Sequence, residues 1–167
     1  MRKAYKLLKP LLFVLVLAFA AIPLFRISSF AIVNYKCTRC LEGRGYYGSL
    51  MLTAKVQKKT FTPGENIIVD VTLTNTEQQV FTVVFPDRQK FDLAAWDMLG
   101  NEVYRWSKGK MFAQVITPVI LQPNQSISQQ FNFTIAKKGF YRIKGESAKM
   151  SQPSTTIITS PIKILIR

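Results

Sequence analysis

The stretch "FDLAAWDMLGNEVYRWSKGKMF", residues 91–112, decides the fold that we expect for this chain. Apolar and polar residues alternate on both sides of "DMLG", which is typical of β-strands. Residues 97–100 fit a type I turn, because Asp at the first position accepts from the backbone and Gly at the last tolerates positive φ. The stretch therefore predicts a β-hairpin, and this hairpin carries both tryptophans of the chain.

The register of the hairpin sets which side chains share a face. We expect Trp96 opposite Glu102 and Ala94 opposite Tyr104. One face then carries Trp96, Tyr104 and Trp106, with Asp92 and Glu102. The other face carries Phe91, Leu93, Ala95 and Val103, with Arg105. Two interpretations of the first face stay open: half-buried core, or a ridge of aromatic residues that binds a partner. A slip of one residue would exchange the faces.

Short alternating runs continue on both sides of the hairpin, from residue 51 to the end of the chain. Examples are "NIIVDVTLTN", "QVFTVVF" and "GFYRIKGES", and turn signals such as "TPGEN" and "QPNQS" separate them. Seven or more short strands at this spacing predict an all-β antiparallel sandwich or barrel over residues 51–167. "TTIITSPIKILIR" adds a last strand, in which Pro161 indicates an edge or a break.

The N-terminal segment, residues 1–33, differs in composition from the rest. A basic head, "MRKAYKLLK", precedes an apolar run over residues 11–25. This order predicts a signal or a transmembrane helix. If the helix is retained, the protein is a single-pass protein of the cell membrane, with the domain outside the cytoplasm. Small residues at Ala18–Ala20 and at Ser29–Ala31 favour the alternative, secretion after cleavage of a signal peptide.

Residues 34–50 hold both cysteines and three glycines, and we expect a linker here. Cys37 and Cys40 allow three interpretations: a local disulfide or two inert thiols, a redox or intermolecular role, and a metal shared between two chains. A c-type haem would need His after the second Cys, where Leu41 stands. "LEGRGYYGS" then reads as a loop.

Composition narrows the class of function. The formal charge is +14; the first 26 residues hold 5 of the 23 basic residues and no acid, so 23 − 5 = 18 basic residues remain against 9 acidic ones. That excess favours contacts with anionic surfaces, while no signature of nucleic-acid binding appears. The chain has no histidine, and we find no nucleotide-binding motif. We expect no enzyme, no cofactor and no metal, unless the fold gathers Asp87, Asp92 and Glu146.

The motifs over residues 52–147, taken in order, resemble the BsuPI family, the intracellular proteinase inhibitor domain. The box "Gln-x-Tyr/Phe-Asp-Phe/Leu" is followed by the hairpin "D-x-x-G-x-x-V-W/Y-R-W-S", by a Phe, by a Pro-containing turn and by "Gly-x-Tyr". The matching residues here are Gln89, Phe91, Asp92, Leu93, Asp97, Gly100, Val103, Tyr104, Arg105, Trp106, Ser107, Phe112, Gly139 and Tyr141.

The resemblance implies an immunoglobulin-like antiparallel β-sandwich and protease inhibition. Two departures stand out. Pro123-Asn124-Gln125 replaces the family's Pro-Gly-Glu turn, and Asn tolerates left-handed φ. The family's namesake domain is cytoplasmic, whereas this chain begins with an export or anchoring segment.

Two hypotheses for function follow. In the first, an exported or membrane-tethered inhibitor binds a protease through a rigid loop, either "SKGKMF" with Lys108 and Lys110 or "TFTPGEN". In the second, the sandwich is a structural or adaptor module of the envelope. It would then dock another protein or an anionic wall polymer through Trp96, Tyr104 and Trp106, without inhibition.

Overall fold

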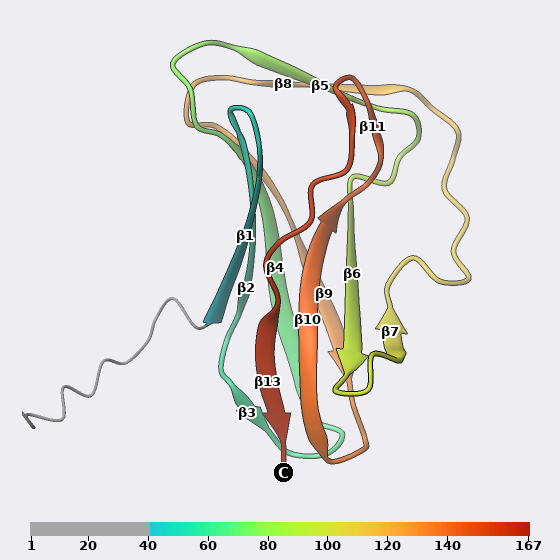
Figure 1. Cartoon of the computed structure of the whole chain (residues 1–167). Helices are drawn as coiled ribbons and strands as arrows, with labels where there is room; N and C mark the ends of the chain where they lie inside the picture. The colour runs from blue at the N-terminus through green and yellow to red at the C-terminus, as the bar shows by residue number, and fades with distance from the viewer. Residues whose placement is uncertain (1–40) are drawn as a thin grey trace, which may run out of the picture. The chain divides into compact units, whose positions relative to one another are not determined.

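The computed structural model describes residues 41–167, which form an all-β fold (Figure 1). The predicted N-terminal helix, Cys37 and Cys40 lie outside the described residues. Within the described part, no helix has the length and apolarity to cross a bilayer. The strands are β1 (Glu42–Tyr47), β2 (Leu50–Val56), β3 (Thr60–Phe61), β4 (Asn66–Asn75), β5 (Phe81–Phe85), β6 (Phe91–Asp97), β7 (Glu102–Arg105), β8 (Thr117–Leu121), β9 (Ser126–Thr134), β10 (Gly139–Ser147), β11 (Met150–Ser151), β12 (Ser154–Thr155) and β13 (Ile162–Ile166).

Two sheets make up the sandwich that the sequence predicts. One has the strand order β1-β2-β4-β9 and the other β3-β13-β10-β6-β7. All neighbours are antiparallel except β3 and β13, which are parallel. Strand β4 shows how the alternation works: Val69, Val71 and Leu73 are fully buried, while Asp70 is exposed. The inward rows of both sheets form a single hydrophobic core.

A smaller layer covers one end of the sandwich. β5 pairs with β8, and Val84 of β5 bridges to Gln152 next to β11 (Figure 1). Val83, Phe85 and Leu121 from this layer are fully buried in the core. β5 and β8, which flank the β6–β7 hairpin in the chain, therefore close this end of the core.

The expectation of a loop over residues 41–49 is wrong, because strand β1 lies there and pairs with β2 from Glu42 to Tyr47. Gly43 and Gly45 are the reason. A Cβ at these positions would lie 2.1 Å from the carbonyl oxygen of Ser160 and 2.2 Å from that of Ile158. Gly43 and Gly45 therefore allow the backbone of residues 158–160 to pack closely on β1. Glycines in this stretch indicate close packing of two backbone segments and not a loop.

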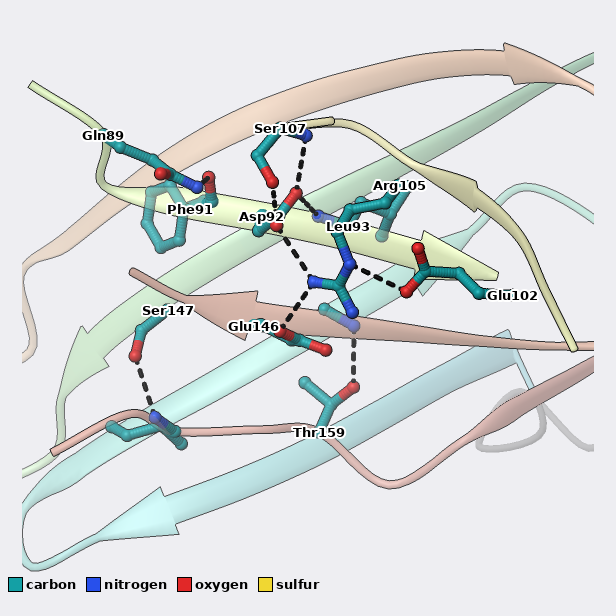
Figure 2. Close-up of polar contacts among 12 residues, drawn as sticks. Gln89, Phe91, Asp92, Leu93, Glu102, Arg105, Ser107, Glu146, Ser147 and Thr159 are labelled. Atoms are coloured by element: carbon teal, nitrogen blue, oxygen red, sulfur yellow. Dashed lines mark hydrogen bonds and ion pairs between the residues drawn. The ribbon is translucent and has the colours of Figure 1, made fainter. Parts of the chain in front are cut away.

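The segment that packs on β1 also joins the two sheets. The amide of Ser160 donates to the carbonyl of Arg44 at 2.9 Å, and the amide of Thr159 donates to that of Gly145 in β10 at 3.0 Å. The side chains of Thr159 and Ser147 add two bonds to the same edge (Figure 2). β13 begins directly after Pro161, so the predicted break at this proline is confirmed.

Candidate binding site

The β6–β7 hairpin is built around the turn that the sequence predicts. The amide of Gly100 donates to the carbonyl of Asp97 at 3.2 Å, and Gly100 has φ of 91°. The Asp97 carboxylate accepts from the Asn101 amide and from its side chain, both at 2.9 Å. The hydrogen bond from the Asn101 side chain is the main reason why the pKa of Asp97 lies below its ordinary value. The turn prediction is confirmed.

The register differs from the prediction at one point. Trp96 lies opposite Glu102 as expected, but Ala95, and not Ala94, lies opposite Tyr104. The two pairings differ by one residue, so Val103 is an extra residue in β7 and the hairpin contains a β-bulge. Beyond the bulge every side chain of β7 points to the face opposite to the one expected. The predicted common face of Trp96, Tyr104 and Trp106 is therefore wrong.

Tyr104 and Trp106 pack inward, against the core. The Tyr104 ring stacks on Phe133 with centroids 4.3 Å apart, and Trp106 meets Phe131 edge-on at 5.2 Å. Burial, with a smaller contribution from Asp92, raises the pKa of Tyr104. Both rings are half-buried, so they belong to the packing of the sandwich and do not form a free ridge.

Trp96 lies on the outer face of the five-stranded sheet, among cations. The Arg105 guanidinium lies 5.9 Å from the centroid of its ring and the Lys144 ammonium 5.5 Å. Trp96, Gly100, Arg142, Lys144 and Pro161 line a hollow of about 260 Å³. Of the two tryptophans, Trp96 is thus the one that faces away from the core.

A polar network on this outer face ties β6, β7 and β10 together (Figure 2). Arg105 is its centre: one terminal nitrogen lies 3.1 Å from Asp92 and 3.2 Å from Glu146, and Nε lies 2.8 Å from Glu102. Burial by itself would lower the pKa of Arg105, but hydrogen bonds to Glu146 and Glu102 outweigh it and raise the pKa. Arg105 therefore stays charged and offsets part of the negative charge of the three carboxylates around it.

Asp92 links this network to the following loop. Its side chain is buried, with 6% of the residue exposed, and accepts from the Ser107 hydroxyl at 2.6 Å and from the Ser107 amide at 3.1 Å. The amide of Leu93 donates to the same carboxylate at 2.8 Å. With Arg105 these contacts satisfy a buried charge, which explains the Asp-x(12)-Arg-x-Ser spacing in physical terms.

The loop over residues 107–112 is fastened at both ends. Ser107 is bound to Asp92, and Phe112 packs on Trp106 with centroids 5.6 Å apart. Within the loop, the Lys110 amide donates to the Ser107 carbonyl at 3.0 Å, and the Lys110 ammonium lies 3.6 Å above the Trp106 ring. Lys108 is exposed and Met111 is 99% exposed. The loop is therefore held at both ends and exposes Lys108 and Met111 at its tip.

The remaining motif residues have positions that support the backbone. The Gln89 side chain donates to the Phe91 carbonyl at 3.3 Å, and the Phe91 side chain is buried. Gly139 has φ of 150°, a conformation that favours glycine. The Tyr141 hydroxyl donates to the Lys137 carbonyl at 2.8 Å. Sequence reasoning missed Lys144 and Arg142 as neighbours of the hairpin, because the pairing of β10 with β6 brings them there from more than 40 positions away.

The fold brings together two of the three acids that could indicate an enzyme, Asp92 and Glu146, and leaves Asp87 apart from them. Asp92 and Glu146 lie opposite each other on β6 and β10, with Arg105 between them. Asp87 instead accepts from the Gln89 amide at 2.7 Å. Within residues 41–167, no group of three or more His, Cys, Asp or Glu side chains is placed to hold a metal ion. The arrangement supports a structural role, in which Arg105 links β6, β7 and β10 through their carboxylates.

Comparisons with solved structures give weak likenesses. Spo0M, the sporulation control protein from Bacillus subtilis, has a TM-score of 0.45 and 14% identity over 72% of this chain, which spans 50% of that protein. A beta-glucosidase from Listeria innocua has a TM-score of 0.42 and 14% identity, over 70% of this chain and 16% of that one. The C-terminal domain of wzt has a TM-score of 0.48 and 12% identity, over 75% and 78%. With scores this low, none of them bears on function.

Comparison with protein families is more informative. No curated protein sequence matches the chain. The model of one family, BsuPI, described as the intracellular proteinase inhibitor, matches residues 53–152. These residues are more than half of the chain, and they contain the hairpin, the Asp92 network and the fastened loop described above. This chain belongs to the BsuPI family of intracellular proteinase inhibitors.

Proposed function

We propose that this chain is an exported, membrane-tethered member of the family, which acts by binding another protein, in the first place a protease. Family membership supports an inhibitor-like domain. The basic head and the apolar run of residues 1–33 support export and tethering, and secretion after cleavage is the alternative. The observation that carries the binding function is the fastened loop over residues 107–112.

This loop has the property that a protein inhibitor needs, a tip whose conformation is set before binding. Binding a protease costs less conformational entropy when the inserted segment is already ordered. Here the Asp92–Ser107 hydrogen bonds and the Trp106–Phe112 contact order both ends, while Met111 is 99% exposed. The side chains that would enter the cleft of the protease are Lys108 and Met111. Lys110 lies over the Trp106 ring and would help to hold the conformation of the loop.

We further infer that the sandwich is of the immunoglobulin-like type. In that type, strands A, B and E share one sheet and strands C, F and G the other. The orders β2-β4-β9 and β6-β10-β13 agree with this arrangement. The bond from the Tyr141 hydroxyl to the Lys137 carbonyl, at the start of β10, resembles the tyrosine corner of such domains. Domains of this type commonly bind partners through the loops of a rigid sandwich.

The test is a titration of the purified protein against a panel of serine proteases and metalloproteases, with residual activity as the readout. We expect saturable, stoichiometric inhibition without cleavage of the loop. The double variant Lys108→Ala and Met111→Ala should weaken inhibition at least about tenfold. Lys55→Ala and Lys149→Ala, two exposed lysines elsewhere, serve as the control. A folded protein that inhibits none of the proteases would contradict the proposal.

A second function is supported by the surroundings of Trp96. Arg142 and Lys144 line its hollow, and the Arg142 Nε is buried without a hydrogen-bond partner among the described residues. Two cationic residues that line one hollow favour binding of a carboxylate or phosphate group, as in an adaptor that docks an acidic protein or an anionic wall polymer. Binding of this kind should weaken steeply as salt is added. It should also be lost in Arg142→Ala, while Lys108→Ala leaves it unchanged.

A further inference from the structure

Four apolar side chains are exposed at one end of the sandwich. Met98 and Leu99, in the β6–β7 turn, are 62% and 88% exposed, and Val103 in β7 is 46% exposed. Phe140, at the start of β10, is 58% exposed. Together with the β9–β10 turn they line a groove of about 510 Å³. Single exposed apolar residues are ordinary, but a cluster at the tips of adjacent turns indicates a contact surface.

The charges at this end favour an anionic partner. Lys137 and Lys138 line the same groove and are exposed, and neither takes part in an ion pair within residues 41–167. Glu65 lies in a turn whose Gly64 amide donates to the Ile135 carbonyl, and its charge is paired with Lys58. Asp97 also lines the groove and accepts hydrogen bonds from the neutral Asn101, so it keeps its charge. Two unpaired lysines against one carboxylate leave an excess of positive charge beside the apolar cluster.

The direction of β1 relates this end to the N-terminal segment. β1 begins at Glu42, which is in register with Lys55 of β2, and runs away from the end at which β9 reaches Thr134. β1 therefore begins in the half of the sheet nearer these turns, level with Gln130 and four residues short of Thr134. The eight residues 34–41 separate Glu42 from the expected end of the apolar segment. Eight extended residues span at most about 29 Å, so a tethered sandwich would stay close to the bilayer.

We propose that this end of the sandwich rests on an anionic membrane surface. Met98, Leu99 and Phe140 enter the boundary between headgroups and acyl chains, and Lys137 and Lys138 contact anionic headgroups. This inference rests on the tethering part of the proposed function. It has a consequence for binding: Asp92, which holds Ser107, lies five residues along β6 from Asp97. The loop over residues 107–112 would thus stand roughly 16 Å further from the bilayer, open to a partner.

The test uses the full chain in vesicles, with Cys37→Ser and Cys40→Ser so that a single new cysteine can carry the environment-sensitive fluorophore NBD. The probe is attached at Leu99→Cys, and the matched control is Gln78→Cys, an exposed residue at the opposite end. Vesicles are made of phosphatidylcholine alone or mixed with phosphatidylglycerol. The readouts are the NBD emission and its quenching by spin-labelled lipids.

We expect the probe at position 99 to be blue-shifted and quenched in the mixed vesicles, and the probe at position 78 to remain in water. Lys137→Glu with Lys138→Glu should lower the fraction of tethered protein whose sandwich is docked on the bilayer. The ratio of docked to undocked sandwich should fall at least about tenfold. Lys55→Glu with Lys149→Glu changes the charge equally and should have little effect. A probe at position 99 that stays as water-exposed as the one at position 78 overturns the inference.

Flotation of the vesicles after an alkaline wash separates this failure from failure of the tether. Protein that floats while the probe at position 99 stays in water retains the tether and contradicts the docking. Protein that does not float contradicts the tether and, with it, the docking. Quenching at position 99 that is the same in both kinds of vesicle, and the same after lysine reversal, would also overturn the inference, because it would show apolar insertion without recognition of anionic lipid.

Discussion

Trp96 and Trp106 belong to one hairpin and face opposite sides of its sheet. Trp106 packs edge-on against Phe131 of the opposing sheet, at 5.2 Å. Trp96 lies outside, within 6 Å of two cations, Arg105 at 5.9 Å and Lys144 at 5.5 Å. The bulge at Val103 produces the difference, because one extra residue reverses the direction of every later side chain of β7. The type of side chain, identical at the two positions, does not decide the role.

The two faces also differ in how they hold the loop over residues 107–112. On the inner face the loop depends on aromatic packing, through Trp106 and Phe112. On the outer face it depends on charge and hydrogen bonds, through Asp92 and Ser107. A loop fastened by two kinds of interaction keeps its conformation when one of them weakens. Two predictions separate the contributions of the two faces, and a third concerns the turn that both faces share.

The largest effect is expected from comparing the two tryptophans directly. Trp106→Ala should lower the free energy of unfolding by about 3 kcal/mol, because it leaves a cavity between Phe131 and Phe112. Trp96→Ala should lower it by about 1 kcal/mol or less, since its ring lies on the outer face of the sheet and makes cation contacts in place of packing into the core. Urea denaturation followed by circular dichroism measures both. Equal losses would mean that the two rings are equally part of the core.

A loss of stability of intermediate size is expected when the polar network on the outer face is disrupted. Asp92→Ala should cost about 2 kcal/mol, because it leaves the Ser107 amide and hydroxyl and the Leu93 amide without their acceptor. Amide hydrogen exchange should become faster at Ser107 and Leu93. Glu102→Ala, which removes a more exposed carboxylate from the same arginine, should cost less than about 1 kcal/mol and is the control. Unchanged exchange at Ser107 in Asp92→Ala would show that aromatic packing alone fastens the loop.

The smallest effect concerns the turn that both faces share, and it depends on pH. The pKa of Asp97 lies below its ordinary value of 3.8, so the folded state favours the ionised carboxylate. Its contribution to stability is present above pH 3.8 and is lost as the pH falls through the lower folded-state pKa. Asp97→Asn should therefore show a shallower acid dependence of the unfolding free energy than the parent.

Glu65 provides the control for this measurement. Its pKa is also lowered, chiefly by its hydrogen bond with Lys58. Some acid dependence should therefore remain in Asp97→Asn and decrease further when Glu65→Gln is added. An Asp97→Asn variant whose pH profile matches that of the parent protein would mean that the Asn101 contacts do not favour the ionised carboxylate.

The sequence by itself determined the features that depend on a few neighbouring residues. The alternation in residues 66–75 predicts a strand with Val69, Val71 and Leu73 inside, and the structure confirms it. Asp97 and Gly100 predict their turn because the side-chain acceptor and the positive φ act within four residues. The strand break at Pro161 and the family motif of the hairpin were also predicted from a few neighbouring residues. Such signals are local, and no distant contact needs to be known.

Only the tertiary structure decided the bulge at Val103, the strand over residues 42–47 and the neighbours of Trp96. The bulge depends on which face of β7 gains more from burial against Phe131 and Phe133 of the opposite sheet. Gly43 and Gly45 read as a loop until the Ser160 segment is known to pack on them. Lys144 and Glu146 reach the hairpin through the β6–β10 pairing. In each case the conformation is stabilised by contacts with residues far away in the chain, and the local sequence pattern carries no information about those contacts.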